Sequence, residues 1–185
     1  MIASQAELIY YSGVGSRTAP QNILETIHEI SRINDKNNFI LRSGGADGCD
    51  LAFELHATTK EIWVPWIGFN GSASINLPNK DAFIMASEIH TGWSILSSGA
   101  RKLHARNCHQ VLGADLKTPS KFLVCWTPQG KTVGGTATSI KLAQKNNIPI
   151  FNIGIYEKFP KELILDNYYS FLYEVLENSS LCLTP

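Results

Sequence analysis

Hydrophobic residues gather in short runs along the chain, and segments with helical spacing lie between them. Five of the runs are rich in β-branched and aromatic residues, as strands are: residues 8–11, 39–42, 61–66, 121–126 and 148–153. In the segment that follows the first run, Ile23, Ile27 and Ile30 recur three or four positions apart, which predicts a helix over residues 21–34. Strands alternating with helices indicate right-handed crossovers and a parallel sheet.

The remaining helical patterns complete an α/β arrangement. We expect helices over residues 51–60, 81–90 and 98–112, around residues 140–143, and over residues 160–178. The continuous apolar run FLVCW fits a strand that is buried on both faces. The sequence therefore predicts one Rossmann-like, doubly wound α/β domain over residues 1–185. Its core is residues 8–153, with a mostly parallel sheet, helices on both faces and a C-terminal helix.

The charge balance restricts the partners to be expected. Lys and Arg number 16 and Asp and Glu number 16, so the formal net charge is zero, which argues against a surface dominated by phosphate contacts. A content of 44% hydrophobic and 17% charged residues is typical of a globular protein. No apolar run approaches the roughly 20 residues that span a bilayer, and the N-terminus lacks the pattern of a secretory signal. We expect a cytoplasmic protein with no membrane contact.

The four cysteines do not suggest a metal site. Cys49, Cys108, Cys125 and Cys182 form neither a CxxC pair nor a cluster with histidines at zinc-finger spacing. Cys125 lies within an apolar run, where a buried inert thiol is expected. We therefore expect reduced thiols and neither a metal nor a cofactor.

Three glycine-rich loops, at residues 13–17, 43–48 and 130–136, each follow a predicted strand and precede a predicted helix. Glycine allows close approach of an anion to the backbone, and a helix N-terminus presents unpaired N–H groups. No loop matches a standard motif: Thr18 replaces the third glycine of the dinucleotide fingerprint, and Cys125 replaces the first glycine of a P-loop. Together the three loops favour a phosphate-bearing ligand at the carboxyl edge of the sheet.

Four segments in order resemble the DprA/Smf proteins: GVGSR, LRSGGADGCDLAFE, HARN and GGTATSIKLAQKNNIPIFNI. These proteins belong, with the cytokinin-activating LOG phosphoribohydrolases, to the wider SLOG superfamily of Rossmann-like nucleotide binders. The resemblance spans roughly residues 8–153 and implies that the glycine loops contact a ligand. The residues it implies, together with a loop acid and a possible base-stacking aromatic, are Gly13, Gly15, Ser16, Arg17, Ser43, Gly44, Gly45, Asp47, Trp66, Arg106, Gly134, Gly135 and Thr136.

The resemblance leaves three hypotheses open. The first is a protein that senses or sequesters a nucleotide or a phosphate-containing derivative of one. The second is a LOG-like enzyme that breaks an N-glycosidic bond, but Ser139 stands where those enzymes carry a glutamate. The third is DprA-like binding of single-stranded DNA, although His109 replaces the second arginine of the RNR segment. The sequence favours binding over catalysis, and both related families imply a homodimer.

Overall fold

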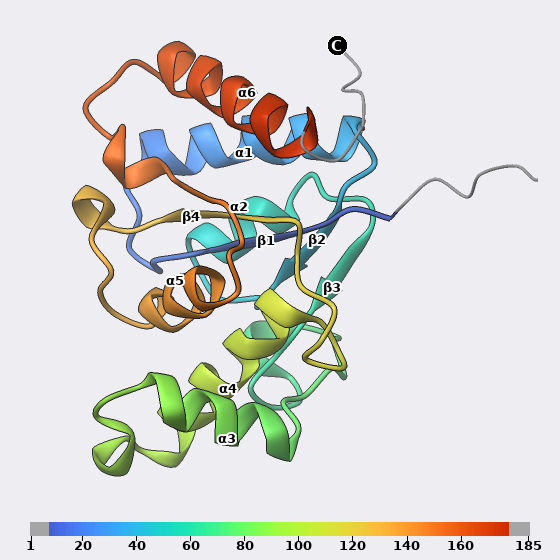
Figure 1. Cartoon of the computed structure of the whole chain (residues 1–185), viewed down its shortest axis with the longest axis vertical. Helices are drawn as coiled ribbons and strands as arrows, with labels where there is room; N and C mark the ends of the chain where they lie inside the picture. Colours follow the sequence, from blue (N-terminus) through green and yellow to red (C-terminus); the bar gives the residue numbers. More distant parts are fainter. Residues whose placement is uncertain (1–7, 178–185) are drawn as a thin grey trace, which may run out of the picture.

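A computed structural model of the chain describes residues 8–177, and its centre is a five-stranded sheet (Figure 1). The strands are β1 (Tyr10–Gly15), β2 (Ile40–Ser43), β3 (Lys60–Ile62), β4 (Phe122–Trp126) and β5 (Ile150–Asn152). Their order in the sheet is β3-β2-β1-β4-β5, and every neighbouring pair is parallel. The predicted Rossmann-like α/β fold is confirmed.

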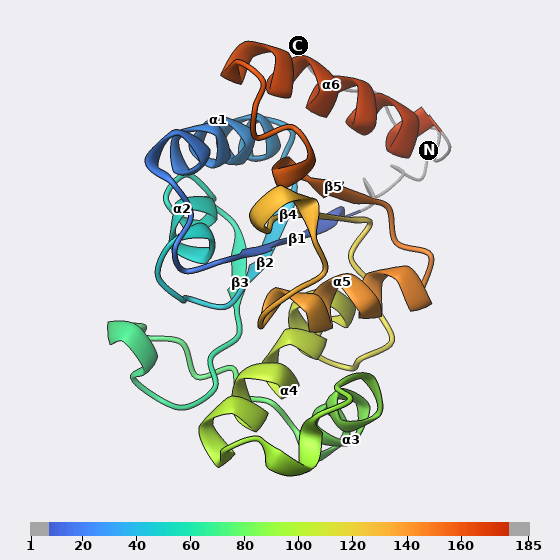
Figure 2. The same ribbon diagram turned by 90° about the vertical axis from the view of Figure 1, so that its left-hand side faces the viewer.

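Within residues 8–177, six α-helices cover the sheet in two layers (Figure 1, Figure 2). They are α1 (Gln21–Lys36), α2 (Cys49–Glu54), α3 (Lys80–Ile89), α4 (Ser98–Leu112), α5 (Thr136–Lys145) and α6 (Lys161–Glu177). One hydrophobic core lies between the sheet and α1, α2 and α6, and it includes Ile27, Phe53 and Tyr168. A second core, on the other face, includes Cys108 and Ile140 from α4 and α5. Because both faces are covered, the strands carry continuous apolar runs.

The strand order reverses between β1 and β4. From β1 the chain winds outward through β2 to β3, and it then crosses the sheet to place β4 on the other side of β1. The long crossing carries α3 and α4 to the second face. In an open parallel sheet such a reversal leaves a crevice at the carboxyl ends of the two strands, which is where ligands bind.

Several boundaries differ from those that the hydrophobic pattern predicted. β1 runs on through Gly13 to Gly15, since these residues still pair with β4. A Cβ at Gly13 would lie 2.7 Å from side-chain atoms of Leu41 and Phe53. These glycines let α2 pack closely on the strand. β3 ends at Ile62, ahead of Pro65, while Trp63 forms an isolated bridge with Asn76.

The second helix also differs from its prediction. α2 begins at Cys49 and ends at Glu54, so it is shorter than the predicted helix over residues 51–60. Its N-cap is Gly48, and no side chain caps its first turn. The predicted C-terminal helix corresponds to α6, apart from residue 178, which lies outside the described residues along with Cys182. Within residues 8–177, no helix has both the length and the apolar character needed to cross a membrane.

Candidate functional site

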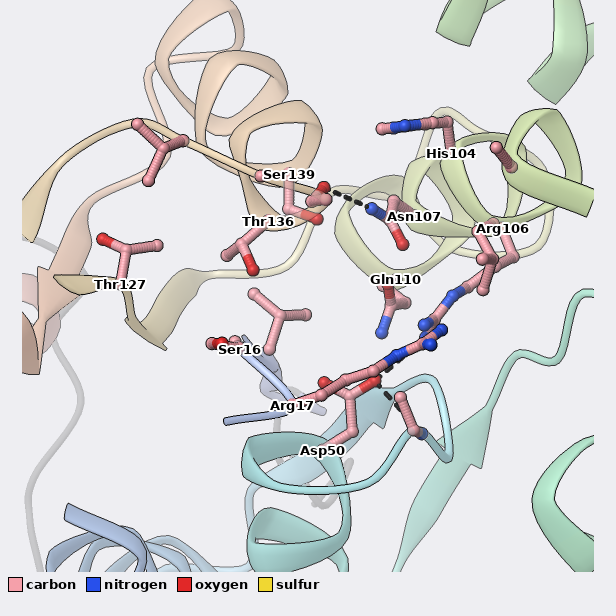
Figure 3. A pocket seen from close by; sticks show the side chains of 18 of the residues that line it. Ser16, Arg17, Asp50, His104, Arg106, Asn107, Gln110, Thr127, Thr136 and Ser139 are labelled. Atoms are coloured by element: carbon pink, nitrogen blue, oxygen red, sulfur yellow. Dashed lines mark hydrogen bonds and ion pairs between the residues drawn. The ribbon is translucent and has the colours of Figure 1, made fainter. Parts of the chain in front are cut away.

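A cavity of about 470 Å³ opens at the carboxyl ends of β1 and β4, where the strand order reverses. Its walls come from the loop after β1, the second glycine-rich loop, α4, and the loop that leads into α5. Figure 3 shows Arg106, Asn107 and Gln110 of α4 across the cavity from Ser16 and Thr136. The fold thus joins segments that lie more than a hundred residues apart in the chain.

Some of the site residues predicted from the sequence line this cavity, and others do not. The predicted residues that line it are Gly15, Ser16, Arg17, Arg106, Gly134, Gly135 and Thr136. The first and third glycine-rich loops therefore converge on the cavity, and Arg106 joins them from α4. From the second glycine-rich loop, Ala46 lines the cavity, whereas the preceding Gly44 and Gly45 do not.

The other predicted residues lie outside the cavity lining. Four of them, which come from the first two glycine-rich loops, have structural roles. Gly13 lies beneath α2, and the Ser43 hydroxyl donates a hydrogen bond to the Gly13 carbonyl oxygen at 2.8 Å. A Cβ on Gly44 would overlap the guanidinium of Arg106, so this position has room only for a glycine. Gly45 has a φ of +64°, in the left-handed region that favours glycine.

Asp47 and Trp66 lie outside the cavity lining, Asp47 next to Ala46 in the chain and Trp66 near Gly99 at the start of α4. Asp47 Oδ1 accepts a hydrogen bond of 2.8 Å from the side chain of Asn70. The Trp66 side chain is exposed and lies edge-to-face with Phe69, with ring centroids 5.2 Å apart. Trp63, in contrast, is buried and stacks on His109 at 4.2 Å, as expected of a core residue.

Arg106 and Asp50 form a buried ion pair in the wall of the cavity. Arg106 Nη1 lies 3.0 Å from Asp50 Oδ2, and Asp50 also accepts a hydrogen bond from the backbone N–H of Ala46 at 3.4 Å. Burial raises the pKa of the Asp50 carboxyl, and the Arg106 charge opposes this rise. The pair therefore connects α2, the second glycine-rich loop and α4.

Two amides extend this support to the third loop. The Gln110 carboxamide is oriented so that both its oxygen and its nitrogen find partners. In this orientation the oxygen accepts hydrogen bonds from Arg106 Nη1 at 3.0 Å and from the Gly44 N–H at 2.8 Å. Its nitrogen then donates to Asn107 Oδ1 at 2.8 Å, and Asn107 Nδ2 donates to the Gly135 carbonyl at 3.0 Å. One hydrogen-bonded network thus holds the second and third loops around the cavity.

Two residues of the cavity lining carry buried polar atoms without partners among residues 8–177. Arg106 Nε and Ser139 Oγ are buried and make no hydrogen bond with the described residues, although both residues line the cavity. Leaving a buried polar group unpaired costs about 1–3 kcal/mol, which a ligand that pairs with it would recover. These two atoms are the strongest local indication of a ligand.

The N-terminus of α5 borders the cavity. Gly135 is its N-cap residue, no side chain caps its first turn, and no acidic residue lies in that turn. Its unpaired N–H groups and the positive end of its dipole favour an anion. Arg17 lines the opposite wall with an exposed side chain, and no salt bridge is formed by it within residues 8–177. The cavity therefore suits a phosphate.

His104 is a neutral polar group in the same wall. Its Nδ1 lies 2.7 Å from Thr138 Oγ1, and its ring centroid lies 4.4 Å from that of His90. Burial, with the nearby His90 and Arg106, lowers the pKa of His104 to about 4. The imidazole is therefore uncharged at neutral pH.

Two further polar residues, His109 and Arg42, form their hydrogen bonds and ion pairs with residues outside the cavity lining. His109 hydrogen-bonds through Nδ1 to the Gly113 carbonyl oxygen at 2.9 Å, and its Nε2 accepts from the Asn79 N–H. Arg42 pairs with Glu61 at 2.8 Å, outside the cavity lining. Among residues 8–177, no group of three or more metal-ligating side chains is close enough to hold a metal ion.

Sequence reasoning missed Asn107, Gln110 and His104 as cavity residues. The available signal was helical spacing, since Leu103, Arg106, Asn107 and Gln110 lie three or four positions apart on one face of α4. The family resemblance singled out Arg106 as a ligand contact, although the matching HARN segment also contains His104 and Asn107.

Comparison with known proteins supports the fold. No family model and no curated protein matches the chain. Among solved structures, the chain is similar to DNA processing protein A from Helicobacter pylori, whose structure is described as giving insight into a unique mode of binding single-stranded DNA. The two share 18% sequence identity and a TM-score of 0.54, over 88% of this chain and 80% of that one. This likeness supports the DprA-like fold that the motifs suggested.

Proposed function

We propose that the protein binds a nucleotide, or a phosphate-containing derivative of one, in the cavity between β1 and β4. The observation that carries this proposal is the pair of buried, unpartnered donors, Arg106 Nε and Ser139 Oγ, beside the uncapped N-terminus of α5. A phosphate against Gly134, Gly135 and Thr136 would accept from backbone N–H groups there, and Arg17 would add a charge-assisted contact.

The cavity also has room for the rest of a nucleotide. Its volume of about 470 Å³ lies within the range of roughly 300–1,000 Å³ that small-molecule sites occupy. Ala100, Leu103, Pro128 and Val133 give it an apolar wall. A flat base would bury its faces against this wall, while the polar loops hold the phosphate and sugar.

The acidic content of the cavity lining favours binding of the ligand over cleavage of its N-glycosidic bond. In the part of the chain that the structure describes, Asp50 is the one carboxylate in the cavity lining, and it pairs with Arg106. Ser139, at the position of the LOG glutamate, carries no charge that could stabilise an oxocarbenium ion. We therefore propose a site that senses or sequesters its ligand.

Single-stranded DNA is the second candidate ligand. It is favoured by the similarity of the fold to DNA processing protein A, together with the exposed Arg17 at the cavity. The zero net charge of the chain argues against extensive coating of a strand.

Calorimetric titration of the protein with the four common nucleoside 5′-monophosphates, ADP-ribose and the matching unphosphorylated nucleosides tests the proposal. We expect at least one phosphorylated compound to bind, its nucleoside to bind at least tenfold more weakly, and Ser139→Ala to weaken binding. Ser170→Ala, on the exposed face of α6, is the matched control. Absence of binding by every compound overturns the proposal, and release of free base over time replaces it with the enzyme hypothesis.

A further inference from the structure

Residues 63–77 form a closed loop beside the cavity. At its base, the Ile62 carbonyl oxygen accepts hydrogen bonds from Ser74 Oγ at 2.5 Å and from Asn76 Nδ2 at 3.2 Å. The Val64 N–H donates to the Asn76 carbonyl at 2.9 Å, which brings the two ends of the loop together. Compact loops with joined ends are frequently functional.

The tip of this loop is fastened to the second glycine-rich loop. Asn70 Nδ2 donates both to the Gly45 carbonyl oxygen at 3.2 Å and to Asp47 Oδ1 at 2.8 Å. Asn70 holds a left-handed φ of 53° to make these contacts. Since Ala46, between the two acceptors, lines the cavity, the loop tip is fixed directly at the cavity rim.

Trp66 projects from this fastened loop with 41% of its surface exposed. Its six-membered ring lies 3.9 Å from where a Cβ on Gly99 would stand, and the next residue, Ala100, lines the cavity. Figure 2 shows the segment beside the first turns of α4. Phe69 supports the indole edge-to-face. A large aromatic side chain held in a fixed position yet left exposed favours stacking on a flat ligand group.

Arg17 lines the cavity beside the second glycine-rich loop, to which the tip of the Trp66 loop is hydrogen-bonded. The backbone carbonyl of Arg17 packs against Gly48, so the loop after β1 and the second glycine-rich loop are in contact at this point. The Arg17 side chain is exposed and lines the cavity. A phosphate on this side of the cavity would therefore meet a cation.

We propose that Trp66 stacks on a second base of the ligand, so that the site takes two nucleosides joined through phosphate. This inference rests on the proposed function, because the first nucleotide occupies the cavity. Arg17 contacts the phosphate linkage, and the indole of Trp66 covers the base beyond it. A free dinucleotide and the end of a single strand share this chemistry.

Titration with thymidine 5′-monophosphate, the 5′-phosphorylated dinucleotide pTpT and a 12-residue oligothymidylate tests the inference. We expect pTpT to bind at least tenfold more tightly than the monophosphate, because a second base stacked on an aromatic ring strengthens binding. Trp66→Ala should lower the ratio of the two affinities several-fold, with the Arg17 contact to the linkage remaining, while Trp66→Phe should restore most of the ratio. Ile75→Ala, at a more exposed apolar position on the same loop, is the control and should leave the ratio unchanged.

The outcomes separate the two proposals. Equal affinity of the wild-type protein for the monophosphate and pTpT, or an unchanged ratio in Trp66→Ala, overturns the second-base subsite and leaves the proposed function intact. No binding of any of the three probes overturns both. If the subsite holds, a 12-residue strand that binds no more tightly than pTpT identifies a free dinucleotide as the ligand source, and tighter binding identifies a strand.

Discussion

The Nη1 atom of Arg106 lies 3.0 Å from Oδ2 of Asp50, and both side chains are more than nine-tenths buried. This ion pair joins the helix after the second glycine-rich loop to the helix that forms one wall of the cavity. Much of the Arg106 side chain is therefore used to position the loops, while its Nε is buried without a hydrogen-bond partner among the described residues.

Breaking this pair should destabilise the protein strongly. Arg106→Ala leaves the Asp50 carboxylate buried without its partner, so we expect the free energy of unfolding to fall by about 3–5 kcal/mol. Urea denaturation measures this loss. Arg32→Ala, which breaks the exposed Arg32–Glu29 pair, is the control and should change it by less than about 1 kcal/mol. The double variant Asp50→Asn/Arg106→Met should lose less stability than the sum of the losses in Asp50→Asn and Arg106→Met. Losses that simply add would show that the two side chains do not stabilise each other.

Two glycines should respond to alanine in opposite ways. A Cβ at Gly44 would overlap the Arg106 guanidinium, so Gly44→Ala should lower the thermal midpoint by several degrees. Gly135 has helical φ and ψ with open space around its Cβ position, so Gly135→Ala should keep or slightly raise the midpoint. If a phosphate lies at this helix N-terminus, Gly135→Ala should nevertheless weaken nucleotide binding. Unchanged affinity would exclude the phosphate from this position.

Removal of the Ser139 hydroxyl should affect binding without affecting stability. Its Oγ is buried and has no partner, so Ser139→Ala removes an unsatisfied group from a helix and should not lower the free energy of unfolding. We expect nucleotide affinity to fall about tenfold, the equivalent of one hydrogen bond. Paired measurements of denaturation and calorimetry check this, and a stability loss above about 1 kcal/mol would show that the hydroxyl has a structural partner.

Arg17 should carry much of the salt dependence of binding. Its side chain is exposed, so Arg17→Ala should leave the thermal midpoint within about a degree while lowering affinity for a phosphorylated ligand by about tenfold. The loss should shrink as the salt concentration rises, because salt screens an exposed charge. Calorimetry at 50 and 500 mM salt tests this, with Lys131→Ala, outside the cavity lining, as control. A loss that is independent of salt would contradict an electrostatic role.

His104 should make the protein less stable in mild acid. Its pKa is about 4 in the folded protein, against an ordinary value of 6.5 for a solvated histidine, so below pH 6.5 the unfolded chain takes up the proton more readily. The contribution of His104 to stability is complete above pH 6.5 and is lost as the pH falls toward 4. We expect a contribution on the order of 1–2 kcal/mol.

Urea denaturation of the wild-type protein and of His104→Gln at pH 7.0 and pH 4.5 measures that contribution. The difference between the two proteins removes the effects of other groups whose pKa values are also shifted by burial, such as Asp50, Glu54 and His109. The wild-type protein should lose more stability than the variant on acidification. Equal losses would mean that His104 is not the responsible group.

The elements were largely predictable because they depend on local patterns. Apolar runs and helical spacing identified all five strands and the α-helices that the structure describes, since burial on both faces of a parallel sheet leaves a strong signal in the sequence. Errors occurred where tertiary packing sets a boundary. β1 extends through Gly13 to Gly15 because these residues pair with β4, which no local pattern reveals.

The candidate site was predictable only in part. The sequence by itself determined the α/β class and the three glycine-rich loops, because these depend on residue type and short spacing, and the family resemblance added Arg106 as a candidate ligand contact. The tertiary structure alone decided which loop residues meet: Arg17, Arg106 and Gly135 line one cavity, whereas Gly44 supports Arg106 and Trp66 lies outside the lining. The physical reason is that strand order and helix packing bring together residues distant in the chain, and a glycine that serves close packing has the same sequence signal as one that approaches a phosphate.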